Sequence, residues 1–343
     1  MNRRDFLRVS GAGCIEALGA TGVFAKASSS EGNVMTVLGP IAPSEFGSAL
    51  PHEHVLVDFI GADRVSRTRY DANEAYDVAL PYLRRVRELG CRGFVECTPA
   101  YLGRDPRLLE RLGKAAGLHI LTNTGYYGAA KDQYVPRHAY EESADQLADR
   151  WVKEWVDGIE GTGIRPGFTK TGVDAGPLSA IDRKLVQAAA RTHARTGLTI
   201  ASHTGNTRAA LEQMDVLTEE RVGPDAFIWV HAQSDWELGS RVEAARKGAW
   251  IEIDNLSEKT VGECADRVGA LKQQGLLHRL LVSHDAGWYR PGEPKGGTFR
   301  GFEAAYTAFV PALRQAGWTL EEVRQLMVAN PAAAFTVRIR RVV

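Results

Sequence analysis

The 343-residue chain has few cysteines, no net charge and no long apolar run, and each shortage excludes a class of protein. Four cysteines are too few for a disulfide framework in a chain of this length. Lys plus Arg and Asp plus Glu both number 42, so no basic surplus suggests nucleic acid as a partner. No segment approaches the roughly 20 apolar residues that a membrane-spanning helix needs. The 44% of apolar residues is typical of a globular protein with a large core.

The first 27 residues are predicted to be an export signal rather than part of the fold. The paired Arg3 and Arg4, followed by Phe6 and Leu7, resemble a twin-arginine signal. A weakly apolar stretch follows, and Ala25-Lys26-Ala27 fits a small-x-small cleavage site. We therefore expect a periplasmic or secreted mature protein. The alternative is that this segment forms an amphipathic N-terminal helix of the mature chain.

From about Val34 onward, short apolar runs alternate with longer amphipathic segments. The runs are rich in Val, Ile and Phe, as buried parallel strands are, and they predict strands at 54–59, 93–97, 119–122, 167–170, 199–203, 227–231, 249–253 and 280–283. Helices are expected at 73–89, 105–116, 181–196, 236–247, 261–274, 303–315 and 320–328, with Asn330-Pro331 ending the last one.

Eight strands with helices between them predict a (β/α)8 barrel, one domain over residues 34–337. Residues 34–48 are expected to form a strand and turn ahead of it. A doubly wound sheet is the rival fold, but it usually carries a glycine-rich phosphate loop after its first strand. No GxGxxG follows the first predicted strand here. The barrel is therefore the preferred architecture.

Polar residues suited to metal binding stand where they would converge at one end of this barrel. His52 and His54 flank Glu53, and strand alternation puts the two imidazoles on one face with Glu53 turned away. Four later strands are followed or ended by a polar residue, namely Lys170, His203, His231 and Asp285. Because the C-terminal ends of barrel strands meet at one mouth, these six side chains are expected to lie together.

The lysine indicates which kind of metal site this would be. An ammonium group would repel cations, whereas a carbamate formed from Lys170 and carbon dioxide is an anion with two oxygens that could bridge two metals. The set then fits a two-metal hydrolytic site with a hydroxide between the ions. His284 is expected to point away from Asp285, because neighbours on a strand face opposite sides.

Taken in order, these segments resemble the phosphotriesterase family of the amidohydrolase superfamily. The matching pieces are PHEH (51–54), ELGCR (88–92), GFTK (167–170), SHTG (202–205), VHAQ (230–233), SHD (283–285) and NPA (330–332). They span nearly the whole chain after the predicted signal, and as a set they are specific.

The resemblance implies a ligand set for two divalent metal ions. His52, His54 and Asp285 would hold the more buried ion, His203 and His231 the more exposed one, and carboxylated Lys170 would bridge both. Asp285 would also be the general base that takes the proton from the bridging hydroxide. Zinc is the first expectation, with manganese or cobalt as substitutes, because imidazole and carboxylate ligands suit all three.

The sequence departs from the family where substrate is chosen. An acidic residue of the family's phosphotriesterases is replaced by Ser234, and the arginine typical of its lactonases is missing from residues 253–257. We expect a hydrolase of lactones and other esters, with phosphotriesters second and amides open. A ligand-binding barrel without turnover is the alternative of another class.

The expected partner is a small-molecule substrate, and we expect a homodimer. Six polar or aromatic residues near the predicted mouth are candidate substrate contacts: Tyr126, Tyr127, Gln233, Asp254, Trp288 and Tyr289.

Overall fold

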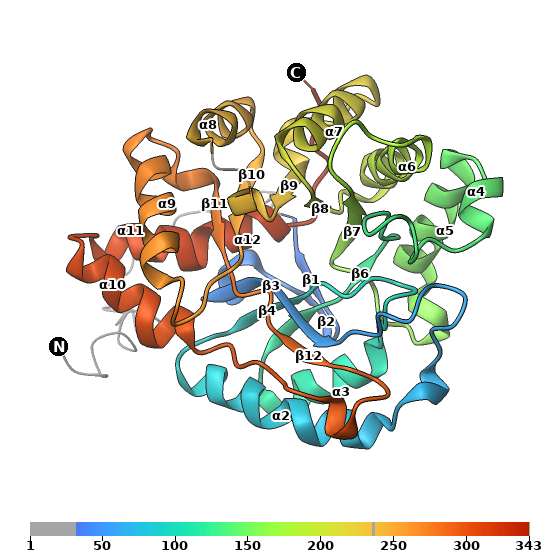
Figure 1. Ribbon diagram of the computed structural model, residues 1–343, viewed down its shortest axis with the longest axis horizontal. Helices are drawn as coiled ribbons and strands as arrows, with labels where there is room; N and C mark the ends of the chain where they lie inside the picture. The colour runs from blue at the N-terminus through green and yellow to red at the C-terminus, as the bar shows by residue number, and fades with distance from the viewer. Residues whose placement is uncertain (1–31, 235–236, 343) are drawn as a thin grey trace, which may run out of the picture. The chain divides into compact units, whose positions relative to one another are not determined.

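The computed structural model describes residues 32–234 and 237–342, and its parallel strands form a (β/α)8 barrel. Figure 1 shows the strands near the centre with the helices arranged around them. The predicted signal at residues 1–27 lies outside the described residues. The three described cysteines, Cys91, Cys97 and Cys264, are buried free thiols. Within the described part of the chain, no helix combines the length and apolarity needed to cross a membrane.

The strands follow the predicted order along the chain. The antiparallel pair β1 (Val34–Thr36) and β2 (Gly39–Ile41) precedes the barrel. The barrel strands are β3 (Ala49–Leu56), β4 (Gly93–Glu96), β5 (His119–Leu121), β6 (Asn123–Thr124), β7 (Phe168–Val173), β8 (Ile200–Thr204), β9 (Phe227–Val230), β10 (Trp250–Ile253), β11 (Leu280–Val282) and β12 (Gly287–Tyr289).

Two sheets share the ring, with orders β11-β10-β9-β8-β7-β6 and β12-β3-β4-β5. On one side β5 and β6 are separated by Thr122 alone, so together they form the third strand of the barrel. On the other side β12 pairs in parallel with β3, and the amide of Asp285 donates to the carbonyl of His52 at 3.1 Å. The first and last strands therefore meet at the residues expected to bind metal.

The helices cover the outside of the strands. They are α2 (Ala72–Glu88), α3 (Pro106–Ala116), α4 (His138–Glu141), α5 (Ala144–Asp157), α6 (Ala180–Thr196), α7 (Thr207–Glu219), α8 (Leu238–Lys247), α9 (Val261–Gln273), α10 (Val310–Gln315), α11 (Leu320–Arg324) and α12 (Asn330–Phe335). Local signals fix several ends: Asp105 caps α3, and Gly117 and Gly197 end α3 and α6 in left-handed conformations. Helices α4, α5, α7 and α12 were missing from the sequence prediction.

The first barrel strand begins five residues earlier than predicted. Strand β3 starts at Ala49, so His52 and His54 lie inside it rather than at its start. Pro51 made the segment look broken, because proline cannot donate to a sheet ladder. The ladder absorbs the proline through a register shift with β4 between Leu50 and Glu53.

The prediction that Asn330-Pro331 ends the last helix was wrong. A π-helical turn, Gln325–Ala329, follows α11, and the chain then continues as α12. Pro331 lies in the first turn of α12, where proline is tolerated because the first amides have no partner within the helix. The side chain of Asn330 is buried and donates to the carbonyls of Leu277 and Leu280.

Inward-facing residues change from apolar to polar along the barrel strands. Phe168 on β7 and Ala201 on β8 belong to one apolar cluster with Ile228, Leu281 and, from α12, Phe335. Two residues further along the same strands stand Lys170 and His203, because alternate residues share a face. The apolar cluster therefore forms a floor, and the polar residues lie above it at the C-terminal mouth.

Candidate metal centre

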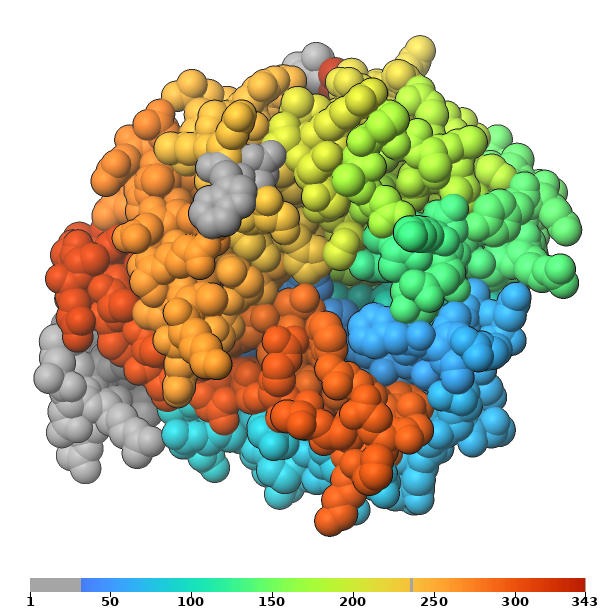
Figure 2. Space-filling model, in the orientation of Figure 1, coloured from blue at the N-terminus to red at the C-terminus, as the bar shows by residue number. Residues whose placement is uncertain are grey.

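The six predicted ligands come from five strands at one end of the barrel. His52 and His54 project from β3, Lys170 from β7 and His203 from β8. His231 directly follows β9, and Asp285 is the third residue after β11. The imidazole rings of His203 and His231 are 4.4 Å apart between centroids, and those of His52 and His231 are 5.1 Å apart. Figure 2 shows this face of the molecule, which is hollowed near its centre between the blue, green and orange segments.

One group of three side chains could hold a cation without rearrangement. The Nε2 atoms of His54 and His52 lie 3.1 Å and 3.9 Å from Oδ1 of Asp285. The ligand atoms of these three residues all lie within 4.8 Å of one another. Asp285 keeps 27% of its side chain exposed, whereas His52 is nearly inaccessible. The carboxylate is therefore the member of this group that solvent reaches.

Lys170 lies beside this group and is buried, with 2% of its surface exposed. Its Nζ is 3.5 Å from Nε2 of His52. Within residues 32–234 and 237–342, no carboxylate lies within 4.0 Å of this amine. A buried amine whose nearest polar partner is an imidazole is an incomplete arrangement, since buried polar groups are normally hydrogen-bonded.

The electrostatic surroundings treat the imidazoles differently: burial keeps two of the four neutral, whereas hydrogen bonds to the carboxylates of Asp254 and Glu252 outweigh burial at His52 and raise its pKa to about 10. Burial lowers the pKa of His54 to about 4 and holds the pKa of His203 well below its usual value, so both rings are neutral near pH 7. Burial opposes ionisation of Asp285 as well, but His54 and His52 outweigh it and lower the pKa of Asp285. Neutral imidazole and ionised carboxylate are the forms that bind metals.

Asp254, which follows β10, joins two of these imidazoles from below. Its carboxylate accepts from Nδ1 of His52 at 2.9 Å and from Nδ1 of His231 at 2.7 Å. Gln233 Nε2 and the amide of His231 also donate to it, at 2.6 Å and 3.1 Å. An ionised carboxylate can only accept, so both Nδ1 atoms carry hydrogen, and Nε2 is the atom of each ring that remains to bind a cation.

The imidazole of His54 is also oriented through its Nδ1 atom, here by the hydroxyl of Thr98 rather than directly by a carboxylate. Its Nδ1 lies 2.8 Å from the hydroxyl of Thr98, and that hydroxyl donates to Oε1 of Glu96 at 2.6 Å. Because the hydroxyl hydrogen is used on Glu96, Thr98 accepts from Nδ1 of His54. The Nε2 of His54 is therefore also free. Sequence reasoning missed Thr98, whose only signal is its position just after the second barrel strand.

Glu53 is turned away from the ligands, as alternation predicted, and it holds the loop that carries Asp285. Its Oε1 accepts from the hydroxyl of Ser283 at 2.7 Å and from Nδ1 of His284 at 2.6 Å. Its Oε2 accepts from the amide of Ala286 at 3.0 Å. Asp285 has a φ of 51°, an uncommon value for a non-glycine residue. The predicted direction of His284, opposite to Asp285, is confirmed.

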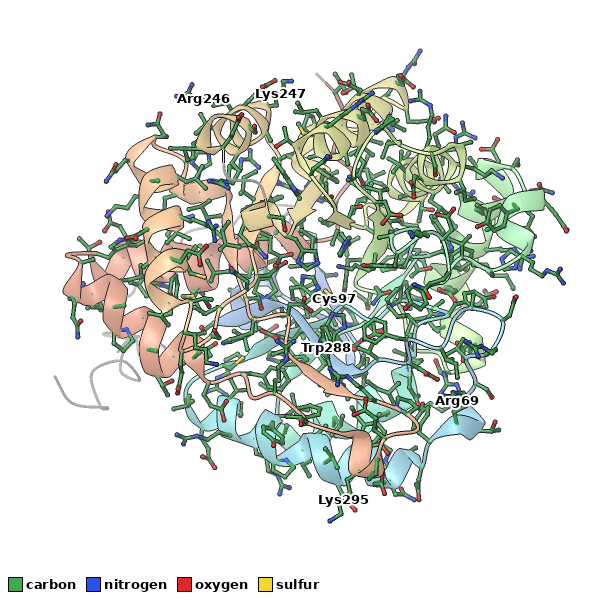
Figure 3. The ribbon with its side chains drawn as sticks, in the orientation of Figure 1. Arg69, Cys97, Arg246, Lys247, Trp288 and Lys295 are labelled. Carbon is green, nitrogen blue, oxygen red and sulfur yellow. The ribbon has the colours of Figure 1, made fainter. Side chains whose placement is uncertain are left out.

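Two of the six candidate substrate contacts lie beside the ligands. The ring of Tyr127 meets His203 edge-on at 5.1 Å between centroids. The ring of Trp288 meets His54 edge-on at 6.0 Å, and Figure 3 places Trp288 near the centre of the view. Both are positioned to border a substrate bound at the mouth.

Of the other four candidates, Tyr126 and Tyr289 lie away from the ligands, and Gln233 and Asp254 support the imidazoles. The hydroxyl of Tyr126 is 3.0 Å from Nε2 of His138, and Tyr126 borders a separate cavity of about 640 Å³ lined by none of the six predicted ligands. Tyr289 is buried and donates to Glu74 of α2. Asp254 is fully buried and Gln233 supports it, so both act beneath the imidazoles. Neighbouring residues on an extended chain face opposite ways, which separates Tyr126 from Tyr127.

Comparison with known proteins matches this chain to one family over most of its length. The model of the phosphotriesterase family matches residues 32–335. An aryldialkylphosphatase of Saccharolobus solfataricus is 25% identical over 307 residues, covering 86% of this chain and 97% of the relative. An N-acetyltaurine hydrolase of Danio rerio is 25% identical over 349 residues, covering 90% of this chain and 99% of the relative.

A solved structure shows the same arrangement of elements. The crystal structure of a mutant of a phosphotriesterase-like lactonase from Deinococcus radiodurans superposes with a TM-score of 0.80. It is 28% identical, and the match covers 88% of this chain and 99% of the other.

Proposed function

The chain belongs to the phosphotriesterase family and is a metal-dependent hydrolase, and we propose that it cleaves lactones and other esters at a centre of two divalent cations. The observation that carries the proposal is the convergence of four imidazoles, Lys170 and Asp285 at the C-terminal mouth of the barrel. Active sites of (β/α)8 enzymes lie at this end.

The donor set fits two cations rather than one. His52, His54 and Asp285 would hold the first ion, and His203 and His231 the second, with zinc expected before manganese or cobalt. Three of the four imidazoles have their Nδ1 atoms committed to Asp254 or Thr98, which leaves Nε2 to bind. When bound, such a pair of cations lowers the pKa of a water held between them and polarises the scissile carbonyl.

Lys170 completes this set as a carbamate. The nitrogen of its neutral amine would attack carbon dioxide, forming an N–C bond, breaking one C=O π bond and releasing one proton. The product replaces a buried amine by an anion whose two oxygens can each serve one metal. The amine is buried at the centre of the imidazoles with no carboxylate of the described chain beside it, which supports the assignment.

The residues at the mouth position the substrate and move the proton. Asp285 is partly exposed, and its carboxylate would accept the proton of the attacking water and pass it to the leaving group. Tyr127 and Trp288 border the ligands with aromatic rings and would exclude bulk water from the carbonyl. Glu53 keeps the Asp285 loop in place through four hydrogen bonds.

Phosphotriesters are the second candidate substrate class. The relatives' own names point to phosphorus esters, amides and lactones, so the scaffold itself does not select the bond. Ser234 lacks the acidic side chain of the family's phosphotriesterases, and residues 253–257 lack the arginine of its lactonases, so these two departures do not select between the two substrate classes.

Metal analysis combined with a substrate panel tests this function. We expect about two divalent ions per chain, and turnover of lactones and aryl esters that a chelator abolishes and zinc restores. The panel should contain lactones, aryl esters, N-acyl amides and phosphotriesters. Full activity with at most one tightly bound ion would contradict the two-cation centre. Tight lactone binding without turnover of any panel member would favour the ligand-binding barrel.

Substituting Asp254 with asparagine should weaken the binding of one of the two proposed metal ions. One carboxylate oxygen becomes an amide donor, so the imidazole facing it must accept at Nδ1 and carry its hydrogen on Nε2. A loss of about 10–100-fold in metal affinity and activity is expected, as for other residues that orient metal ligands. Equilibrium dialysis against a zinc chelator measures the affinity.

Asp182→Asn is the matched control, because Asp182 is a buried carboxylate that bonds Ser179 at the start of α6. Unchanged affinity for both ions in Asp254→Asn would show that Asp254 does not set the imidazole tautomers.

The mature enzyme is proposed to be exported and to form a homodimer. The paired Arg3 and Arg4 support the twin-arginine route, which carries folded proteins. Replacing both with lysine should leave an active protein in the cytoplasm, measured by cell fractionation, and unchanged export would refute the signal. Light scattering of the purified enzyme tests the dimer.

A further inference from the structure

Two arginines lie against one tryptophan at the mouth of the barrel. The guanidinium carbon of Arg300 is 4.6 Å from the centre of the Trp288 ring, and that of Arg290 is 5.4 Å from it. Arg300 also donates to the carbonyl of Asp285. Since the same indole meets His54 edge-on at 6.0 Å, these guanidinium groups border the candidate metal centre.

The positive charge of this region is only partly neutralised. In the described part of the chain, no carboxylate lies within 4.0 Å of Arg300 or of Arg64, whose Nε donates to the carbonyl of Ile60. Arg290 has an exposed partner, Glu293, at 3.6 Å. Arg69 differs, because the buried carboxylate of Asp58 pairs with it at 2.6 Å.

An open cavity of about 620 Å³ lies beside this tryptophan. Its lining combines Arg64, Arg69 and Arg290 with the rings of Trp288 and Phe59, and it includes Asp58 and Glu293, the partners of Arg69 and Arg290. Arg300 is not part of this lining and adjoins it through the ring of Trp288. Phe59 is 47% exposed, and its ring lies 5.5 Å from that of Trp288. Guanidinium groups on an aromatic wall recognise a ligand that has both an apolar stem and an anionic end.

We propose that Arg290 and Arg300 bind an anionic substituent of the substrate, a carboxylate or sulfonate distant from the bond that is cleaved. The inference rests on the proposed hydrolytic function, and it narrows the substrate to esters, lactones or amides that carry a negative charge. The scissile carbonyl lies at the metal ligands, the stem lies along Trp288 and Phe59, and the anion meets the two guanidinium groups.

The charge arrangement supplies selection in two ways. A charge-assisted hydrogen bond from Arg contributes more than a neutral one, and the aromatic wall lowers the competition from water. Arg64 and Arg300, which have no carboxylate within 4.0 Å in the described part of the chain, also attract an anion before it binds, an effect that salt weakens. A neutral substrate gains neither the charge-assisted hydrogen bond nor the long-range attraction.

Two esters that differ in one terminal group provide the test. Mono(4-nitrophenyl) glutarate and 4-nitrophenyl pentanoate have the same leaving group and the same chain length, but one ends in a carboxylate and the other in a methyl. After subtraction of the spontaneous rates, we expect kcat/KM to be at least about tenfold higher for the anionic ester, through a lower KM. The preference should shrink as the ionic strength rises.

Removing the guanidinium groups should remove the preference. In Arg290→Gln with Arg300→Gln, the ratio of the two kcat/KM values is expected to fall to about one. Lys295→Gln is the matched control: it removes one positive charge from the same loop, but Figure 3 shows Lys295 at the outer edge, away from Trp288. The control should keep the wild-type ratio.

Product binding separates this inference from the hydrolytic function. Calorimetry on the metal-loaded protein compares glutarate with pentanoate, which share the carboxylate that the metals would hold. Glutarate should bind about tenfold more tightly, and the double variant should abolish that difference. If neither ester is cleaved but glutarate is still preferred, the hydrolytic function fails and the anion site stands. Equal binding of the two acids, or an unchanged ester ratio in the double variant, overturns the proposal.

Discussion

Lys170→Ala is expected to lose both cations and all measurable turnover. The alanine removes the proposed bridge, and without its two oxygens each cation keeps only imidazole nitrogens and, for one of them, Asp285. The four imidazoles cannot replace an anion, since they leave the charge of two divalent ions uncompensated. Elemental analysis after gel filtration measures the metal content, and the substrate panel measures turnover.

Rescue by small anions distinguishes a bridge from an ordinary buried lysine. The substitution leaves a space beside His52 that a short carboxylic acid or bicarbonate could enter, and either should restore part of the metal content and part of the activity. Lys184→Ala is a suitable control, because Lys184 donates to three backbone carbonyls and not to the candidate centre. It should show no response to added anions. Two ions and normal rates in Lys170→Ala would refute the carbamate.

Asp285→Asn should reduce kcat far more than it reduces metal affinity. The amide keeps the shape and one ligating oxygen, but it cannot accept the proton of the attacking water. General base catalysis is worth about 10²–10⁴-fold, and the loss should appear in kcat as well as in kcat/KM, because the proton moves in the transition state. Esters with good and poor leaving groups should both be measured, since proton delivery matters more for the poor ones.

The control for this variant is a carboxylate at the same end of the barrel. Asp174 follows β7 and accepts from the amides of Ala130 and Lys131 without contacting the ligand group. Asp174→Asn should keep the metal content and lose little of kcat. If Asp285→Asn retains near-normal rates at saturating metal on every substrate, Asp285 is a ligand only and another group is the base.

The polar strand ends were predictable because a simple rule governs them. Lys170 and His203 stand at the end of apolar runs, and parallel strands in a barrel send all such ends to one mouth. The alternation rule also placed Glu53 and His284 correctly on the far side of the ligands. Each of these inferences needs only the strand period and the direction of the chain.

The residues that support the ligands could not be found in this way. Asp254 lies just after β10, where strand alternation no longer fixes direction, and its orientation depends on Gln233 and two imidazoles from distant segments. The role of Thr98 likewise follows from contact with a residue 44 positions earlier in the chain. In a pair of adjacent tyrosines, alternation says that they diverge but not which one faces the mouth. These orientations depend on contacts between segments that are distant in the sequence, so they cannot be predicted from a single sequence.

The contact between β3 and the residues that follow β11 has a consequence for when, during synthesis of the chain, the metal-ligand group becomes complete. His52 and His54 are synthesised early and Asp285 very late, yet the Nε2 of His54 meets the carboxylate of Asp285 and the carbonyl of His52 receives its amide. During synthesis on the ribosome, the first seven barrel strands can emerge without completing this ligand group. Metal loading must therefore wait until nearly the whole chain has been translated, and a truncated product that lacks residues 280–289 leaves the ribosome without a complete binding site.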